Sequence, residues 1–234
     1  MADIARNKLV LFDIDGTILY TGGAGRRAMQ QSLLEVFGTT GPIRDFPFHG
    51  KTDPLIITEL MTLAGYVPSL IERRLGHFWD VYVEHLREEM SRAHELMVYP
   101  GVVELIQELH RADEHLLGLQ TGNIQRGARL KLEPVGLNGY FPVGAFGDDS
   151  ADRDQLPRIA VERVRQQFNR SYASQDVVIV GDTPADISCA HHFGAKAVIA
   201  ATGFCSYEEL ERAKPDALYR DFSDYRTVME EILR

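Results

Sequence analysis

The sequence predicts an α/β protein: a Rossmann-like three-layer core around a central parallel sheet, with an all-helical segment inserted after the first strand. Short apolar runs such as 9–12 and 177–180 indicate fully buried strands. Strand-like and helix-like segments alternate from about residue 98 onward, which is typical of right-handed crossovers and a parallel sheet. Residues from about 22 to 94 show only helical spacing, so the first strand must join the later sheet.

These observations divide the chain into two predicted domains. Residues 1–20 and 96–234 form a discontinuous Rossmann-like core, and residues 21–95 form a helical cap. Thr52 or Asp53 can cap the second helix of the insertion. The cap is expected to contain three helices, over about 26–37, 53–64 and 68–94.

The core is expected to alternate strands and helices along the chain. The expected strands cover residues 9–12, 116–120, 143–146, 177–180, 197–200 and 217–219. The expected helices cover residues 102–112, 124–135, 156–168 and 207–212, together with a segment that ends at 193.

The composition argues against nucleic-acid-binding, membrane-spanning and disulfide-rich secreted proteins. The formal charge of −9 disfavours nucleic-acid binding through a basic surface, and no apolar run is long enough for a membrane span. The first eight residues show no signal-peptide core, and the two cysteines, Cys189 and Cys205, are too few for a disulfide framework. We therefore expect a cytoplasmic protein with no nucleic-acid or membrane partner.

Polar residues follow three of the predicted strands. Asp13 and Asp15 come after the first strand, Thr121 begins a Thr-Gly-Asn turn after the second, and Asp182 and Asp186 lie in a Gly-Asp-Thr-Pro-Ala-Asp turn after residue 180. In a parallel sheet these strand ends share one edge, where ligands of open α/β sheets bind. Carboxylate oxygens suit Mg²⁺, so a magnesium site is expected at this edge.

A bound phosphate also needs hydrogen-bond donors and a cation. Thr121 offers a hydroxyl, and Gly122 and Asn123 offer backbone N–H groups at a helix start, where anions bind well. Arg153 is the preferred cation, with Arg158 and Lys131 as rivals. Lys131 is disfavoured because it lies ~12 Å along its helix from the strand end.

The two motifs together resemble the haloacid dehalogenase-like superfamily, in its helical-cap branch, and look most like phosphoglycolate phosphatase-like proteins. The match rests on Asp-Ile-Asp-Gly-Thr at 13–17 after an apolar strand, and on Gly-Asp-Thr-Pro-Ala-Asp at 181–186. One motif departs from the pattern, because relatives usually carry Lys-Pro where this chain has Arg153-Asp154. Arginine stays charged and binds phosphate, so the function of that position is retained.

The resemblance implies a role for each motif residue. Asp13 would be the nucleophile that forms an aspartyl-phosphate, Asp15 the general acid/base, and Thr121 a ligand of the transferring phosphoryl group. Mg²⁺ would be held by Asp13, the Asp15 carbonyl and Asp182, with Asp186 in support. The expected substrate contacts are Thr17, Gly122, Asn123 and Lys51, while the role of His49 stays open.

These assignments predict a Mg²⁺-dependent phosphatase that acts on a small phosphorylated metabolite as a monomer or homodimer. Asp15 favours phosphate esters, since related dehalogenases typically lack an acid there. One alternative is a phosphomutase of the same superfamily, which returns the phosphoryl group to a sugar. Another is a receiver-like signalling module, which also uses clustered aspartates and a cation but is shorter and has no helical insertion.

Overall fold

The computed structural model describes residues 7–93, 95–112 and 114–234. Two expectations fall partly outside these ranges: the N-terminal stretch without a signal-peptide core, at residues 1–6, and the end of the long cap helix at His94.

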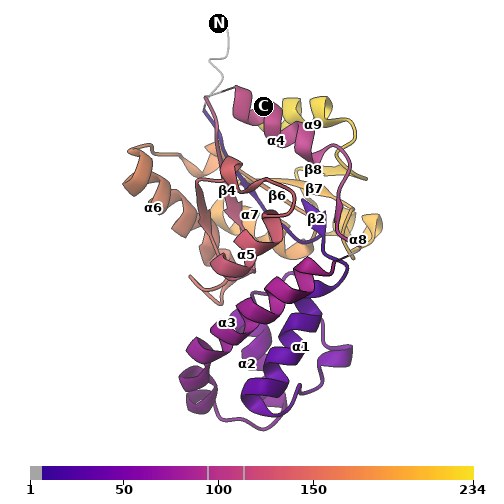
Figure 1. The fold of residues 1–234 in the computed structure, drawn as a ribbon. Coiled ribbons are helices and arrows are strands. Elements are labelled where there is room, and N and C mark those ends of the chain that lie inside the picture. The colour runs from indigo at the N-terminus through magenta and orange to yellow at the C-terminus, as the bar shows by residue number, and fades with distance from the viewer. Residues whose placement is uncertain (1–6, 94, 113) are drawn as a thin grey trace, which may run out of the picture.

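A six-stranded parallel sheet forms the centre of the core (Figure 1). Its strands in spatial order are β5 (Val143–Ala145), β4 (Leu116–Gln120), β1 (Leu9–Phe12), β6 (Val177–Gly181), β7 (Lys196–Ala200) and β8 (Ala217–Tyr219). The first strand lies between β4 and β6, and Phe12 is level with Leu119 and Val180. The predicted fold class is therefore confirmed, and the ends of β1, β4 and β6 meet at one edge.

Helices cover both faces of the sheet, and the alternation of side chains along β1 shows why. Val10 and Phe12 face one apolar cluster, whereas Leu9 and Leu11 face another. On the first face lie α4 (Val102–Arg111), α5 (Gln125–Leu132) and α9 (Tyr225–Leu233). On the second face lie α6 (Leu156–Phe168), α7 (Pro184–Phe193) and α8 (Tyr207–Arg212). The sequence had not predicted α9, and α5 ends three residues earlier than expected.

The insertion forms a helical unit, defined here as residues 24–91, with an apolar cluster of its own (Figure 1). It contains α1 (Ala24–Phe37), α2 (Asp53–Leu63) and α3 (Pro68–Ser91). Phe37 and Tyr82 flank the ring of Phe78 inside this cluster. The unit is all-helical, as predicted, and lies against the strand-end edge of the core.

A small antiparallel sheet joins the two ends of the insertion, and the sequence did not predict it. It consists of β2 (Leu19–Tyr20) and β3 (Met97–Val98). Two-residue strands are too short for an alternating pattern to reveal them. The described part of the chain also holds four short 3-10 helices: η1 (Ile43–Asp45), η2 (Asn138–Tyr140), η3 (Arg153–Gln155) and η4 (Ser174–Asp176).

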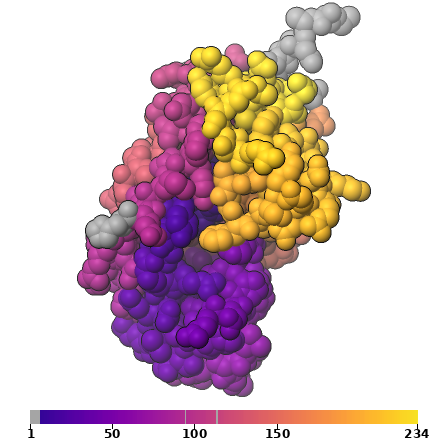
Figure 2. All heavy atoms as spheres, turned by 90° about the vertical axis from the view of Figure 1, so that its right-hand side faces the viewer, coloured from indigo at the N-terminus to yellow at the C-terminus, as the bar shows by residue number. Residues whose placement is uncertain are grey.

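The molecular surface is hollowed where the helical unit meets the C-terminal half of the core (Figure 2). Across the described residues, no helix combines the length and the apolar character needed to cross a membrane.

Candidate active site

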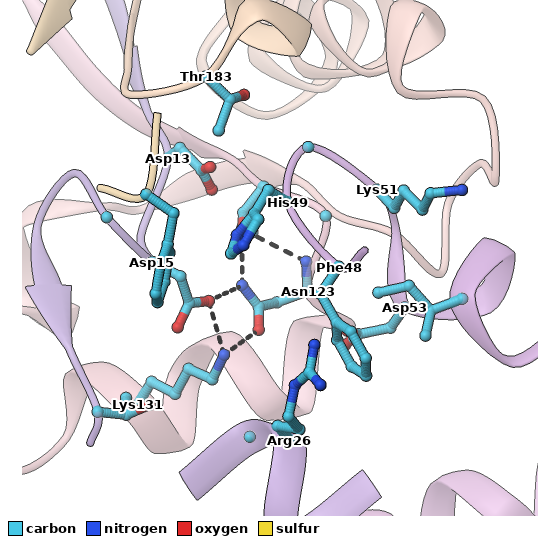
Figure 3. Close-up of a pocket in the computed structure, with 18 of the residues that line it drawn as sticks. Asp13, Asp15, Arg26, Phe48, His49, Lys51, Asp53, Asn123, Lys131 and Thr183 are labelled. Atoms are coloured by element: carbon cyan, nitrogen blue, oxygen red, sulfur yellow. Dashed lines mark hydrogen bonds and ion pairs between the residues drawn. The ribbon is translucent and has the colours of Figure 1, made fainter. Parts of the chain in front are cut away.

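A cavity of about 410 Å³ lies between the helical unit and the strand-end edge of the core (Figure 3). Its core side includes Asp13, Asp15, Thr121, Arg153 and Asp182. These residues come from the ends of three parallel strands and from η3, so the sheet brings together positions up to 169 residues apart in sequence. The crevice at the carboxyl ends of the strands is where open α/β sheets bind ligands.

Asp13 is fixed at the floor of this cavity. It follows β1 directly, its backbone N–H donates to the Val180 carbonyl, and its side chain is almost fully buried. One carboxylate oxygen accepts from the Ile14 N–H at 2.7 Å and the other from Arg153 Nη2 at 2.8 Å. Burial raises the pKa of Asp13, against the lowering effect of the Arg153 charge.

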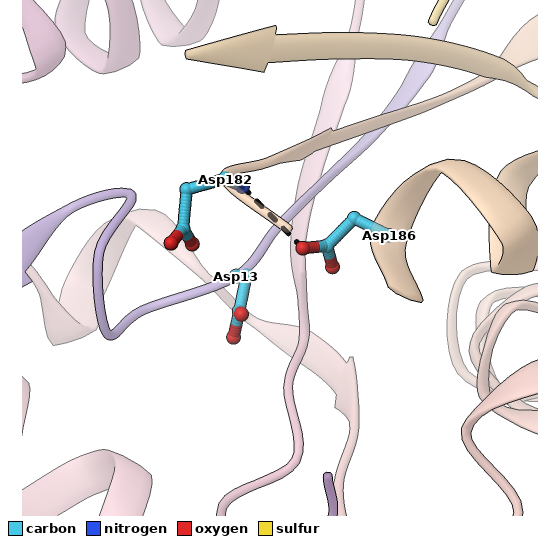
Figure 4. A group of neighbouring side chains, drawn as sticks. All are labelled: Asp13, Asp182 and Asp186. Atoms are coloured by element: carbon cyan, nitrogen blue, oxygen red, sulfur yellow. Dashed lines mark hydrogen bonds between the residues drawn. The ribbon is translucent and has the colours of Figure 1, made fainter. Parts of the chain in front are cut away.

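Asp13, Asp182 and Asp186 form a cluster of buried acids (Figure 4). One oxygen from each lies within 4.8 Å of the others. Burial raises the pKa of Asp182 well above its usual range, and the charges of Asp186 and Asp13 raise it further. Arg153 supplies one positive charge to these three acids. Their carboxylates are the hard oxygen donors that Mg²⁺ takes.

Glycines allow the backbone to approach these carboxylates. A Cβ on Gly16 would lie 2.1 Å from an Asp182 carboxylate oxygen, and one on Gly203 would lie 1.8 Å from the same oxygen. Thr17 donates to the other Asp182 oxygen at 2.9 Å. The chain is therefore shaped around the Asp182 carboxylate, and the donor set fits a divalent cation.

Arg153 is the cation on the Asp13 side of the site. Its Nη2 donates to Asp13 at 2.8 Å and to Asp186 at 2.5 Å, and the side chain is buried. Burial acts to lower the pKa of Arg153, but the charges of Asp186 and Asp13 outweigh it and raise the pKa. Arg153 Nε is buried without a hydrogen-bond partner among the described residues.

Asp15 has a different environment from Asp13, two residues away. Its side chain is 43% exposed, and one oxygen accepts from Lys131 Nζ at 2.6 Å and from Asn123 Nδ2 at 2.8 Å (Figure 3). Lys131 also donates to Asn123 Oδ1 at 2.6 Å. Two of the three rival cations thus lie in the site, each beside a different acid.

Lys131 lines the cavity although helix rise places its backbone far from the strand end. Rise measures distance along the backbone, whereas helical side chains lean toward the N-terminus, and a lysine is long. Lys131 reaches back along α5 to Asp15. Arg158, the third rival, is exposed on α6 and does not line the cavity.

The remaining predicted residues occupy distinct places. Thr121 is fully buried, and its hydroxyl accepts from Asn123 Nδ2 at 2.8 Å. Gly122 lies against the segment before α2, where an added Cβ would be 2.3 Å from the Lys51 carbonyl oxygen. Thr17 is fully buried beside Asp182 and is not among the residues that line the cavity.

Asp186 does not line the cavity either, and both of its carboxylate oxygens accept hydrogen bonds from other residues of the chain. One of its oxygens accepts from the backbone N–H and hydroxyl of Thr183, forming the capping box of α7, and the other accepts from Arg153. Asp186 therefore holds Arg153 while belonging to the acid cluster.

A family model described as haloacid dehalogenase-like hydrolase matches residues 10–200. The chain belongs to the haloacid dehalogenase-like hydrolases. Phosphoglycolate phosphatase from Vibrio cholerae is 25% identical over 232 residues, covering 97% of both chains. The same enzyme from Aquifex aeolicus is 24% identical over 226 residues, covering 95% of this chain and 97% of that one.

A solved structure shows the same fold for this hydrolase. A predicted phosphatase from Clostridium acetobutylicum superimposes with a TM-score of 0.68 at 22% identity, covering 96% of this chain and 99% of that chain. The resemblance inferred from the two motifs is thus confirmed. The chain is an enzyme, a haloacid dehalogenase-like hydrolase of the phosphatase class.

Sequence reasoning missed several residues of the cavity in this hydrolase. Asp53 was expected only as a helix cap, but it lines the cavity and accepts from the Ile124 N–H at 2.9 Å. Tyr82 belongs to the apolar cluster of the helical unit and also reaches the cavity wall. Phe204 lies in the loop after β7, and the rule that placed the other strand ends together could have indicated it.

Proposed function

We propose that this phosphatase hydrolyses a small phosphorylated metabolite through an aspartyl-phosphate on Asp13, with Mg²⁺ as cofactor. The observation that carries the proposal is the contrast between two carboxylates of one cavity. Asp13 is buried against Arg153 and two further acids, whereas Asp15 is partly exposed and bonded to Lys131 and Asn123. Environments that differ in this way support different chemical roles.

In the first step an Asp13 oxygen attacks phosphorus, and the bond to the leaving alcohol breaks. Asp15 gives its proton to that alcohol oxygen. In the second step Asp15 takes a proton from water, whose oxygen attacks phosphorus as the bond to Asp13 breaks. The two displacements replace one difficult hydrolysis, and they return Asp13 as a carboxylate and Asp15 as a protonated acid.

The other polar groups would neutralise and orient the phosphoryl group. Arg153 lies 2.8 Å from Asp13 and supplies fixed positive charge there. Thr121 and the backbone after it offer donors at the start of α5. Asp13 and Asp182 would hold Mg²⁺ together with the Asp15 carbonyl, and Asp186 would support it. Mg²⁺ would supply positive charge that phosphoryl transfer requires.

The helical unit would act as a cap that closes over the bound substrate and excludes water. The proposed cap domain extends beyond the helical unit to residues 21–95. We also propose a monomer or homodimer and a cytoplasmic location, the latter supported by two cysteines that are free in the structure.

The experiment is to compare wild type with Asp13→Asn on acetyl phosphate and p-nitrophenyl phosphate with Mg²⁺. We expect the variant to lose at least ~1,000-fold in kcat because the amide oxygen is a poor nucleophile. Its melting temperature in metal-free buffer should be equal to or higher than that of wild type, since the substitution removes a carboxylate whose charged form is disfavoured by burial. Near-normal turnover by Asp13→Asn would refute the mechanism.

The same assays separate the alternatives. A phosphomutase would form a bisphosphorylated sugar from a sugar phosphate, so mass spectrometry of the products distinguishes it from a hydrolase. A receiver-like module would accumulate a long-lived phosphoenzyme without multiple turnovers. For a phosphatase we expect steady release of inorganic phosphate.

A further inference from the structure

One part of the cavity wall carries a group of aromatic rings. It includes Tyr20, Phe48, His49 and Phe204. The imidazole of His49 stacks on Phe204, with ring centroids 4.2 Å apart and planes inclined by 29°, and Tyr20 meets Phe204 edge-on at 6.4 Å. Phe204 is 68% exposed, and it belongs to the core while His49 belongs to the helical unit. These rings thus lie where the two parts of the molecule face each other.

The cations of the cavity are already engaged. Lys131 is paired with Asp15, and Arg153 with Asp13 and Asp186. Lys51 is paired with Glu59, and its side chain extends away from Asp13 in the close-up (Figure 3). An acidic group of a substrate would have to compete with these carboxylates for a cation.

Arg26 and His49 complete the positive or potentially positive groups of the wall. Arg26 donates through its two terminal nitrogens to three backbone carbonyls, those of Ile43, Arg44 and Phe46, and it lies over the Phe48 ring at 4.2 Å. Burial, and then the Arg26 charge, lower the pKa of His49, so this imidazole is uncharged at neutral pH. This part of the wall can therefore contact a ligand through aromatic rings, whereas the charged side chains near it already have partners.

We propose that the preferred substrates are phosphate monoesters whose alcohol part carries a flat, uncharged ring, which lies against His49 and Phe204. This inference rests on the proposed phosphatase function and names its substrate class. The cavity of about 410 Å³ lies within the range of ~300–1,000 Å³ typical of sites that enclose drug-sized ligands. A short carboxylate-bearing ester would leave the aromatic wall without a partner.

The first test compares kcat/KM among substrates with Mg²⁺ at neutral pH. The ring-bearing esters are uridine 5′-monophosphate, adenosine 5′-monophosphate and phenyl phosphate, and the comparison substrates are phosphoglycolate, fructose 1,6-bisphosphate and acetyl phosphate. We expect at least one ring-bearing ester to exceed phosphoglycolate by roughly tenfold, as stacking energies suggest. A preference for a nucleotide would support the proposal, and so would a preference for phenyl phosphate. The preferred compound shows which kind of ring the site accepts.

Two outcomes would overturn it in distinguishable ways. If phosphoglycolate or the bisphosphate is turned over at least as efficiently as every ring-bearing ester, the substrate class is wrong while the phosphatase function stands. If no compound is hydrolysed, acetyl phosphate included, the proposed function itself fails and the inference with it.

The second test replaces the exposed ring. In Phe204→Ala we expect the ratio of kcat/KM for the best ring-bearing ester to that for acetyl phosphate to fall roughly tenfold, through KM. Phe204→Tyr should restore the ratio. Phe168→Ala is the matched control, because Phe168 is also partly exposed but ends α6 outside the cavity. An unchanged ratio in Phe204→Ala, or an equal fall in Phe168→Ala, would refute the role of Phe204.

Discussion

At the scale of single residues, the two acids of the first motif show how neighbouring positions acquire different chemistry. Asp13 continues from a buried strand and is enclosed by Arg153, Asp182 and Asp186. Asp15 lies beyond it at the cavity wall and keeps contact with solvent. Because both residues are aspartates, the difference between them comes from their neighbours, which the sheet and α5 place beside them.

We propose that Lys131 is a positioning residue, because its Nζ lies 2.6 Å from both Asp15 Oδ2 and Asn123 Oδ1. We expect Lys131→Met to lower kcat about 10- to 100-fold, since proton transfer by a misplaced Asp15 becomes inefficient. KM should change much less, because Arg153 and Thr121 remain in place. Steady-state kinetics with a phosphate ester would separate the two parameters.

Lys196→Met is the control for this substitution. Lys196 also carries a partly buried ion pair, with Glu231, but it lies on β7 and does not line the cavity. Its loss should affect stability without lowering kcat. A Lys131→Met enzyme that keeps wild-type kcat would show that Asp15 does not depend on Lys131.

At the scale of elements, the start of α2 joins the helical unit to the core. The Thr52 hydroxyl donates to the Ala151 carbonyl at 2.9 Å, and the Asp53 N–H donates to the Gly122 carbonyl at 2.7 Å. The Asp53 carboxylate accepts from the Ile124 N–H at the start of α5. One helix N-terminus therefore docks onto the turn that carries Thr121 and Asn123.

Asp53 also gives this junction a pH dependence. Burial raises its pKa to about 6, although Lys131 and the Ile124 hydrogen bond act to lower it. The folded protein keeps this carboxyl protonated at pH values where the unfolded chain, with an ordinary pKa of 3.8, has lost the proton. Asp53 thus favours folding at low pH, and this contribution disappears as the pH rises through about 6.

Asp53→Asn should remove that dependence while its side-chain oxygen still accepts from Ile124. Between about pH 5 and about pH 8, we expect wild type to lose ~1 kcal/mol more unfolding free energy than the variant. Urea unfolding with Mg²⁺ present, at both pH values, measures the difference. Asp80→Asn is the control, because Asp80 is exposed and bridges the same two parts through Arg126 at 2.6 Å. Parallel pH profiles for wild type and Asp53→Asn would contradict the assignment.

At the scale of the whole molecule, the C-terminal segment closes one face of the core. Gly101 precedes α4 with φ +77°, and an added Cβ would lie 1.6 Å from the Phe222 carbonyl oxygen. Phe222 is fully buried, and the α9 residues Val228 and Ile232 join it in the same apolar cluster. Segments more than 120 residues apart therefore meet at a contact that only glycine permits.

Gly101→Ala should destabilise the protein by at least ~2 kcal/mol, because the side chain meets backbone and the conformation is left-handed. For a chain of this size that corresponds to a melting temperature lower by ~4–8 °C. Gly76→Ala is the opposite control: Gly76 lies within α3 with open space around its Cβ position. The Gly76→Ala variant should gain ~0.5–1 kcal/mol of unfolding free energy from the higher helix propensity of alanine. Circular dichroism melts check both, and equal shifts would refute the packing argument.

The sequence by itself determined the fold class, the helical insertion and the acidic edge of the sheet. Apolar runs and motifs are local, and burial of β1 on both faces leaves it no position except inside a parallel sheet. The strand ends after Phe12, Gln120 and Gly181 then had to converge. The two-residue strands β2 and β3 are too short to leave a local pattern. The helix α9 was missed although Tyr225, Val228, Met229, Ile232 and Leu233 follow helical spacing.

Only the tertiary structure decided which partner each acid takes. The reach of Lys131 to Asp15, the docking of Asp53 onto Ile124 and the stacking of His49 on Phe204 all join residues from different elements. Side-chain length, helix orientation and the closure of one unit on another set these contacts, and none of them is encoded in local spacing. The sheet edge follows from periodicity, whereas the shape of the cavity above it follows from packing.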